Sequence, residues 1–154
     1  MGKLIVRIAS LLLIAAFLPT AVLAAEWNLE NGSIEITATA NPEGGTTQTV
    51  SQGGSSAKDS NPTITSNGNQ TSNTITIKAG KDTTANVTIK DTNISTGNAA
   101  IKTEGKGNVN LNVEGTNTVT SGHDHAGVEK SNDGNLTIGS ESGNGKLTAN
   151  GGAY

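Results

Sequence analysis

The sequence predicts an all-β fold, a right-handed parallel β-helix (a β-solenoid) with coils of about 22–28 residues. Segments of the chain repeat at that spacing, which is typical of repeat architectures. Within each repeat, short runs alternate apolar and polar residues, and no helical period of 3.6 residues follows residue 24. Residues 25–154 contain 19 Leu, Ile and Val, and 15 of these are Val or Ile, whose branched side chains favour strands.

Intrinsic disorder is the alternative to weigh, because these 19 aliphatic residues make up only about 15% of residues 25–154. The net charge of the whole chain is a modest −3, and the aliphatic residues recur at regular intervals. In a solenoid, each coil shares its narrow core with the coils above and below. Few apolar side chains therefore suffice for such a fold.

The first 24 residues have the pattern of a secretory signal peptide. Lys3 and Arg7 precede an apolar run, and Val22-Leu23-Ala24 provides the small residues that a signal peptidase reads. The run is shorter than the roughly 20 residues that a membrane-spanning helix needs. We expect cleavage after Ala24, a secreted or cell-surface protein, and no membrane span in the processed chain.

Residues 25–61 are predicted to form an N-terminal strand or cap followed by a flexible loop. The alternating strand centres on Ile34 and Ile36, and Trp27 is expected to cover the open bottom of the coil. The stretch from Asn41 to Asn61 shows no periodicity and contains many turn-forming residues. We therefore expect a loop there.

Residues 62–154 are predicted to form the solenoid coils, beginning with NPTIT and NTITIKAG. The segments AAIKTEGKGNVNL (99–111) and AGVEKSNDGNLTI (126–138) match without a gap at an offset of 27 residues. Inward apolar residues should stack on their equivalents in the next coil. The expected stacks are Val87, Val109 and Leu136; Ile94, Val119 and Leu147; and Ile101 and Val128.

Two polar features of the repeat are interpreted as structural. Asn86, Asn108 and Asn135 each recur just before an inward apolar residue, where Asn can bond to local backbone and to its neighbours in a ladder. Four recurring glycines are expected at turns with positive φ. They are Gly97, Gly107, Gly122 and Gly134.

Charge and cysteine content exclude some classes of protein. Loss of Lys3 and Arg7 leaves no arginine and takes the net charge from −3 to about −5, which argues against a nucleic-acid partner. The chain has no cysteine, so an exported form gains nothing from disulfides. The repeats run up to the C-terminus, so we expect stacking on further coils or on another copy of the chain.

The phrases WNLENGSIEITA, NTITI, VEGTNTVTSGHDHAGVE and GKLTANGGAY resemble secreted Firmicutes β-helix repeat proteins of the carbohydrate-binding-domain-like surface class. The resemblance implies attachment to the cell surface and binding of polysaccharide or cell-wall glycan. Residues 25–154 contain only two aromatic residues, Trp27 and Tyr154, so stacking against sugar rings is limited. A glycan site here would use Asn, Thr, Asp and Lys, alone or with calcium.

The candidate metal ligands are His123, Asp124 and His125, within the string GHDHAG. Two His residues at i and i+2 on a strand face the same side and can share a metal ion. The alternative is a solvated loop between coils. SNDGN (131–135) offers oxygen ligands to calcium, with a simple turn as the alternative.

The sequence gives the least support to a catalytic function. Polysaccharide lyases of this fold need a basic residue facing clustered acids that hold calcium, and here Lys102 aligns with the acidic Glu129. Lys90 and Lys130, the other lysines considered as a catalytic base, also lie next to predicted strand residues. We predict a non-catalytic module that binds polysaccharide along its polar face, with a structural or adhesive stalk as the alternative and a lyase-like enzyme as the remote one.

Overall fold

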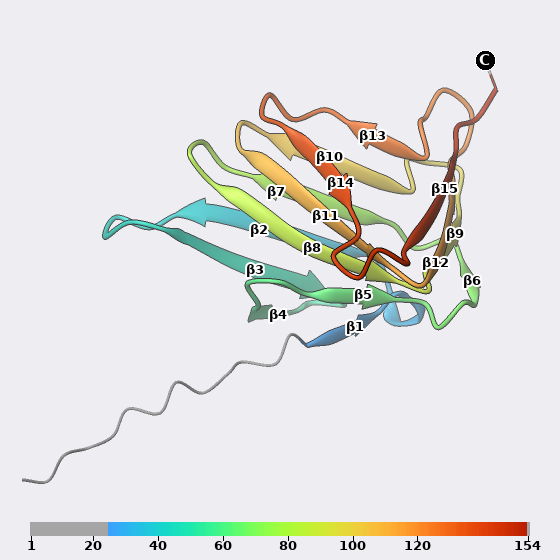
Figure 1. Cartoon of the computed structure of the whole chain (residues 1–154), viewed down its shortest axis with the longest axis horizontal. Helices are drawn as coiled ribbons and strands as arrows, with labels where there is room; N and C mark the ends of the chain where they lie inside the picture. The colour runs from blue at the N-terminus through green and yellow to red at the C-terminus, as the bar shows by residue number, and fades with distance from the viewer. Residues whose placement is uncertain (1–24, 154) are drawn as a thin grey trace, which may run out of the picture.

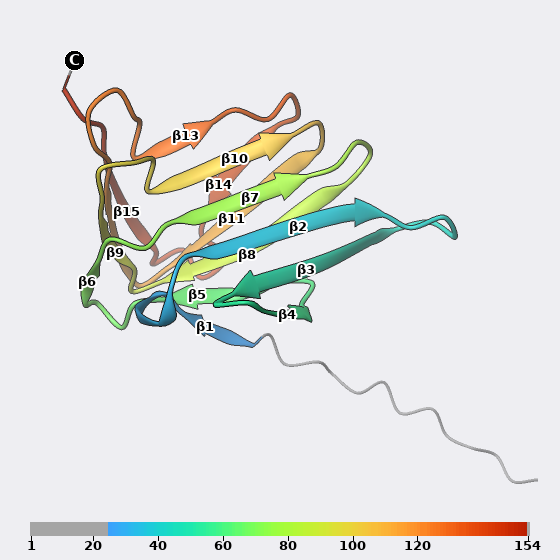
Figure 2. The same ribbon diagram turned by 180° about the vertical axis from the view of Figure 1, so that it is seen from behind.

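The computed structural model describes residues 25–153, so the predicted signal peptide (1–24) and Tyr154 lie outside the described residues. The described chain is a β-solenoid, as predicted (Figure 1). Three sheets run along the solenoid, and the repeating strands within them pair in parallel. Followed from β7 through β8 to β9 in Figures 1 and 2, the chain rises in a right-handed sense.

Sheet A faces the viewer in Figure 1 and has the strand order β1-β5-β8-β11-β14. Its strands are β1 (Glu26–Asn28), β5 (Thr63–Thr65), β8 (Thr84–Lys90), β11 (Asn108–Glu114) and β14 (Leu136–Gly139). Sheet B, in front in Figure 2, has the order β13-β10-β7-β2-β3-β4. It comprises β2 (Ile34–Ala40), β3 (Thr46–Gln52), β4 (Ser55–Lys58), β7 (Ile75–Ala79), β10 (Ile101–Gly105) and β13 (Val128–Lys130).

Sheet C is the shortest of the three and has the order β15-β12-β9-β6. Its strands are β6 (Gln70–Thr71), β9 (Asn93–Ser95), β12 (Thr116–Thr120) and β15 (Lys146–Asn150). One 3-10 turn, η1 (Leu29–Asn31), connects β1 to β2. Each full coil passes through sheets B, A and C in turn, as in β7-β8-β9, β10-β11-β12 and β13-β14-β15.

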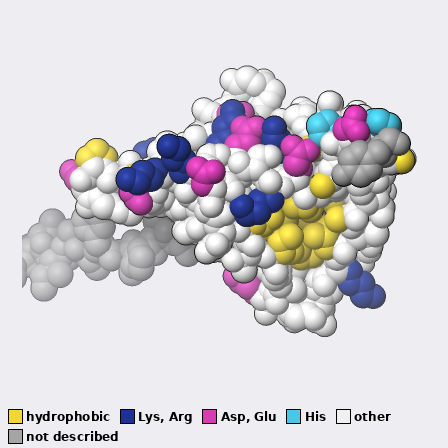
Figure 3. All heavy atoms as spheres, turned by 90° about the horizontal axis from the view of Figure 1, so that it is seen from above, with side chains coloured by type: hydrophobic (Ala, Val, Ile, Leu, Met, Phe, Trp, Pro, Cys, Tyr) yellow, Lys and Arg dark blue, Asp and Glu magenta, His cyan; other side chains and the backbone are white. Residues whose placement is uncertain are grey.

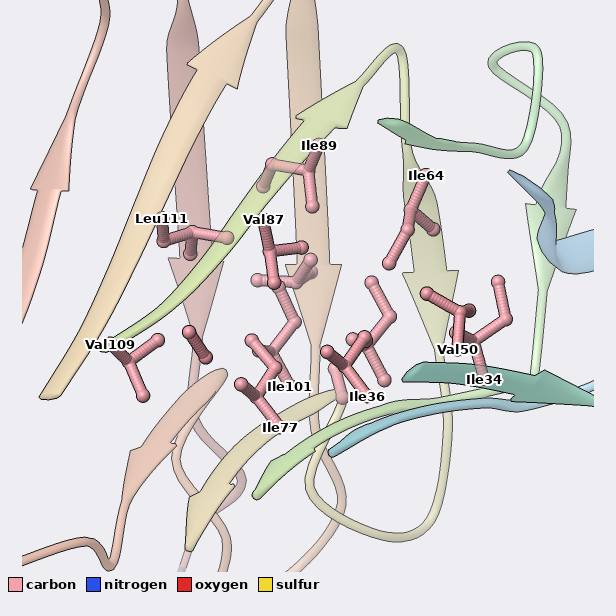
Figure 4. Close-up of a cluster of buried hydrophobic side chains, with 14 of the residues drawn as sticks. Ile34, Ile36, Val50, Ile64, Ile77, Val87, Ile89, Ile101, Val109 and Leu111 are labelled. Atoms are coloured by element: carbon pink, nitrogen blue, oxygen red, sulfur yellow. The ribbon is translucent and has the colours of Figure 1, made fainter. Parts of the chain in front are cut away.

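The core is a column of aliphatic side chains (Figure 4). Along strands such as β7, β10 and β11, these residues alternate with outward polar residues. In β11, Val109, Leu111 and Val113 are buried, whereas Asn108 and Asn110 are exposed. This period of two is the normal geometry of a strand with one face on the core. The regular alternation seen in the sequence is therefore the inward–outward pattern of a coil wall.

The predicted stacking is right in part. Val109 lies opposite Leu136, Ile94 opposite Val119, and Ile101 opposite both Ile75 and Val128. The other two pairings are wrong by two residues. Val87 lies opposite Leu111 because Val109 lies opposite Ala85, and Leu147 lies opposite Asn117 because Val119 lies opposite Ala149.

The cause of these shifts is that alanine can occupy an inward position. A shift of two residues keeps every side chain on the same face of the sheet, so apolar alternation alone cannot exclude it. Ala85 is fully buried and takes the place that the alignment gave to a larger residue. The gapless match between residues 99–111 and 126–138 fixed the register correctly throughout, whereas outside it only the pairing of Ile94 with Val119 was right.

The loop predicted between Asn41 and Asn61 is wrong for most of its length. Strands β3 and β4 form an antiparallel hairpin that extends sheet B below β2. Val50 is fully buried under Ile36, and three of the other six residues of β3 are threonines. Threonine is β-branched and suits a strand, so this polar segment has strand character without apolar alternation.

Gln48 explains how the hairpin closes the lower end of sheet A. Strand β5 pairs with β8 only at Thr88 and Ile89, which leaves Asn86 without a strand below it. The buried Gln48 side chain accepts from Asn86 N at 2.9 Å and donates to Asn86 O at 2.9 Å. One amide side chain thus replaces the missing strand at that position.

The four glycines predicted to need positive φ do not adopt it. Three of them, Gly107, Gly122 and Gly134, instead allow close packing on the coil below. A Cβ on Gly107 would collide with the carbonyl of Gly80 below it, and one on Gly134 with the carbonyl of Gly107. Gly122 has the same relation to Gly97. These glycines form columns where the backbones of successive coils touch.

Candidate functional site

The outer face of sheet A carries a row of amide and hydroxyl groups beside a groove. Asn86 and Thr88 on β8 lie opposite Asn110 and Asn112 on β11, and Thr137 on β14 continues the row from Asn110. On β8 and β11 these positions alternate with buried aliphatic residues, so the core fixes the direction in which they point. Thr137 lies between the partly buried Leu136 and the exposed Ile138. Parallel strands lie about 4.8 Å apart, which sets the spacing of the row along the solenoid.

Hydrogen bonds between coils hold some of these side chains in place. Asn110 Nδ2 donates to Asn86 Oδ1 at 2.9 Å, and Asn112 Nδ2 donates to Thr88 Oγ1 at 3.4 Å. Asn112 Oδ1 in turn accepts from the backbone N–H of Glu141 at 2.9 Å. The last bond ties the loop between β14 and β15 to the side of the row.

That loop forms one wall of an open groove of about 430 Å³ on sheet A. Polar side chains line it, contributed by Asn61, Asn86, Asn110, Asn112, Thr137 and Glu141. Within residues 25–153, Asn86 Nδ2, Asn110 Oδ1 and Thr137 Oγ1 have no hydrogen-bond partner. The groove therefore presents a donor, an acceptor and a hydroxyl to solvent, fixed on a rigid sheet.

The predicted Asn ladder is divided between two columns. Asn108 Oδ1 accepts from the backbone N–H of Asn135 at 2.9 Å, so these two residues do stack. Asn86 belongs to the other column, because it lies opposite Asn110 and not Asn108. This follows from the same two-residue error in register that affected Val87.

The three predicted metal ligands separate into two pairs. His123 Nδ1 lies 2.8 Å from Asp124 Oδ2, and both side chains are about two-thirds exposed. His125 Nδ1 instead contacts Glu129 Oε2 at 2.7 Å. Across residues 25–153, no three His, Asp or Glu side chains gather where they could hold one metal ion. The turn that contains them has the geometry of a solvated loop.

The outer face of sheet B carries charge in place of amides. Lys78 Nζ contacts Glu35 Oε2 at 2.6 Å, and this hydrogen bond raises the pKa of Lys78 above its ordinary value. Lys102 lies 3.0 Å from Glu104 and 3.8 Å from Glu129, as its alignment with Glu129 predicts. The hydrogen bond to Glu104 is the main reason that the pKa of Lys102 is also raised.

The two ends of the solenoid differ. At the base, β1 and the β3–β4 hairpin close the core, and Trp27 packs against it as expected. At the top, Val128, Leu136 and Leu147 are only partly buried, and Ile138 is 46% exposed. Figure 3 looks down on this end and shows hydrophobic side chains at its centre, with charged side chains around the edge.

Two buried asparagines were missed by the sequence analysis. Asn117 accepts from Thr92 N and donates to the carbonyls of Glu114 and Lys146, so it joins three coils. Asn132 accepts from Thr103 Oγ1 and donates to Gly107 O at 2.9 Å. The signal for Asn117 was its place two residues before Val119, which makes it an inward position of an alternating strand.

Comparison of the chain with protein-family models, with curated proteins and with solved structures gives no match. Within residues 25–153 no helix is long and apolar enough to span a membrane. The fold and the groove together define the kind of protein that residues 25–153 form. It is a β-solenoid with an amide- and hydroxyl-lined face on one sheet, a charged face on another, and one end whose strands have an unpaired edge.

Proposed function

We propose that this protein is a secreted or cell-surface solenoid that binds polysaccharide, without catalysis, along the outer face of sheet A. The observation that carries the proposal is the groove beside Asn86, Asn110 and Thr137, with its unpartnered amide and hydroxyl atoms. Sugar hydroxyls both donate and accept hydrogen bonds, and Asn amides offer both functions on one side chain. A groove of about 430 Å³ falls within the usual range for small-ligand sites.

The charge of the site favours neutral polysaccharides. Glu141 lies at the wall of the groove, Glu114 ends β11, and the processed chain has a net charge of about −5. A polyanion such as an acidic cell-wall glycan would meet like charge at each of these places. Calcium could bridge such a chain to the carboxylates, so removal of calcium distinguishes the two ligand types.

The state of Lys102 supports a non-catalytic role. A lyase needs a basic group that is unprotonated near the working pH. The pKa of Lys102 is raised by its hydrogen bond to Glu104, so this amine stays protonated at neutral pH. The closest equivalent of a lyase base on sheet B is therefore a charged surface group.

Binding to a panel of immobilised neutral and acidic polysaccharides, with calcium or with a chelator, tests the proposal. We expect retention on at least one neutral polysaccharide, unchanged by the chelator. Asn110→Ala should weaken it at least threefold, because the substitution removes the free Oδ1 acceptor. Asn150→Ala is the matched control, since Asn150 is an exposed strand residue on sheet C. Equal retention of both variants, or none for the wild type, would refute the proposal.

A structural or adhesive stalk is the second candidate, favoured by the open top of the solenoid. The upper edges of β13, β14 and β15 have no neighbouring strand within residues 25–153, and Ile138 is exposed beside them. The base is covered by the polar, exposed β4, so it offers no apolar counterpart. We infer that further coils or the top of a second copy cover this edge, and the second copy is the occupant tested below.

Analytical ultracentrifugation of the wild type and of Ile138→Lys tests this second candidate. A dimer that Ile138→Lys dissociates would support it, because a lysine placed in an apolar contact must be desolvated. A wild-type monomer at every concentration up to about 100 µM, a Kd limit that corresponds to weak association, would refute it. Because the groove reaches β14 at Thr137, the polysaccharide assay is repeated with Ile138→Lys, so that the two results are read on the same variant.

A further inference from the structure

Asp59 is a buried carboxylate with no cation beside it. Its residue is only 5% exposed, and no Lys or His nitrogen within residues 25–153 lies within 4.0 Å of its oxygens. Lys58, its neighbour in the chain, is exposed on β4. A buried charge is costly unless it is hydrogen-bonded or paired with an opposite charge.

Three N–H groups point at this carboxylate. Oδ2 accepts from Ala25 N and from Trp27 Nε1, both at 3.1 Å, and Oδ1 accepts from Asn61 N at 3.1 Å. The backbone of Asp59 is itself held by Gln48, through its N–H to Gln48 O and its carbonyl to Gln48 Nε2. The position of the carboxylate is thus set by the hairpin and does not depend on Ala25.

Ala25 is the residue at which the signal peptide is expected to be removed. Strand β1 begins at the next residue, and Ala25 O accepts from Thr63 N at 3.2 Å, which fixes Ala25 at the lower edge of sheet A. Hydrolysis of the Ala24–Ala25 peptide bond adds one water. It leaves a carboxylate on Ala24 and turns the Ala25 amide nitrogen into an α-ammonium.

We propose that Asp59 is the receptor for the α-ammonium of Ala25, and that this ion pair locks the base of the solenoid once the leader is removed. The ammonium occupies the position of the amide nitrogen, 3.1 Å from Oδ2, and supplies the cation that the carboxylate lacks. Charge-assisted hydrogen bonds are about twice as strong as neutral ones. Cleavage therefore strengthens a contact that the uncleaved chain already makes.

The inference rests on the export step proposed above and is independent of any ligand. The test uses protein exported from the full-length precursor in a bacterial host. The mass of the purified product gives its N-terminus, and any start other than Ala25 overturns the proposal. Polysaccharide retention of the same sample reports separately on the binding function.

Four exported proteins then form a double-mutant cycle: the wild type, Asp59→Asn, a precursor with Gly-Ser inserted after Ala24, and that insertion combined with Asp59→Asn. The insertion moves the ammonium away from Asp59 but keeps the Ala25 amide. Asp59→Asn alters the hydrogen bonds from Trp27 and Asn61 in the same way in the chain that starts at Ala25 and in the extended chain. The difference between the two effects therefore measures the interaction of Asp59 with the α-ammonium.

The measurement is the unfolding equilibrium constant from urea titration at pH 7, where an α-amine with its ordinary pKa of about 7.7–8.0 is mostly protonated. We expect Asp59→Asn to raise this constant about tenfold more in the chain that starts at Ala25 than in the extended chain. A ratio of threefold or more supports the proposal. A smaller ratio overturns it, because the carboxylate would then act only through neutral hydrogen bonds.

Discussion

Glycine at position 122 provides the sharpest test of how the coils stack. A Cβ at Gly122 would collide with the backbone carbonyl of Gly97 and would lie 2.6 Å from Gly97 Cα. Ordinary van der Waals contact begins at about 3.4 Å, so the two coils must separate locally to admit a methyl group. Forced insertion of a methyl group into a packed interior costs about 1–3 kcal/mol.

Gly97, one coil below in the same column, is the matched control. A Cβ there meets no atom within 4 Å, and its φ lies outside the left-handed range. Gly97→Ala should therefore be neutral or stabilise the fold by about 0.4–1 kcal/mol, because it reduces the freedom of the unfolded chain. The two substitutions are chemically identical and differ only in what lies beneath the new methyl group.

Urea unfolding, followed by Trp27 fluorescence and by circular dichroism, measures the difference. With a slope of about 1–3 kcal/mol per molar urea, a gap of about 1–4 kcal/mol between the variants separates their midpoints by about 0.3 M or more. We expect Gly122→Ala to unfold at the lower concentration. Equal midpoints for the two variants would show that the coils do not touch at this column and would refute the stacking described here.

Three further predictions concern the core, the hairpin and sheet B. Leu111→Ala should destabilise the fold by about 2–5 kcal/mol, since Leu111 is 1% exposed; a loss below about 1 kcal/mol in urea unfolding would argue against its burial. Gln48→Leu leaves the N–H and carbonyl of Asn86 unpaired and should cost about 1–3 kcal/mol, with faster hydrogen exchange at Asn86; unchanged exchange would contradict the role of Gln48. Glu35→Gln should return the pKa of Lys78 toward its ordinary value in an NMR titration. Because the pKa of Lys78 is raised in the folded state, the stabilisation by this pair is present below pH 10.5 and is lost as the pH rises through the folded pKa. The pair is half-exposed, so this stabilisation is at most about 1 kcal/mol. A pKa of Lys78 that Glu35→Gln leaves unchanged would contradict the pairing.

The sequence was informative where the repeat was gapless. Between residues 99–111 and 126–138 it gave the correct partners for Ile101 and Val109, because no insertion could shift one copy against the other. Elsewhere it also gave the correct partner for Ile94, but at two other places a shift of two residues conserved the alternation and went undetected. The buried Ala85 and Asn117 mark the two places where this happened, since neither looked like an inward residue.

The hairpin and the sites were harder to predict for other physical reasons. Strand β3 relies on threonines and on the single amide of Gln48, so it carries too little apolar alternation to be read as a strand. The His123–His125 turn contained suitable ligands, but the direction of each side chain depends on loop geometry that spacing does not fix. The sequence also could not show why glycine recurs at Gly107, Gly122 and Gly134, because the reason is the backbone of the coil below, which a Cβ would meet.

Within residues 25–153, the capped base and the unpaired upper edges of β13, β14 and β15 make the two ends of the solenoid unlike. A duplicated coil inserted between β12 and β13 would meet the same glycine columns and the same inward aliphatic positions above and below, while the hairpin and Asp59 stayed untouched. Length can therefore change in steps of one coil without redesign of either end. Each added step would extend the amide row on sheet A by one position.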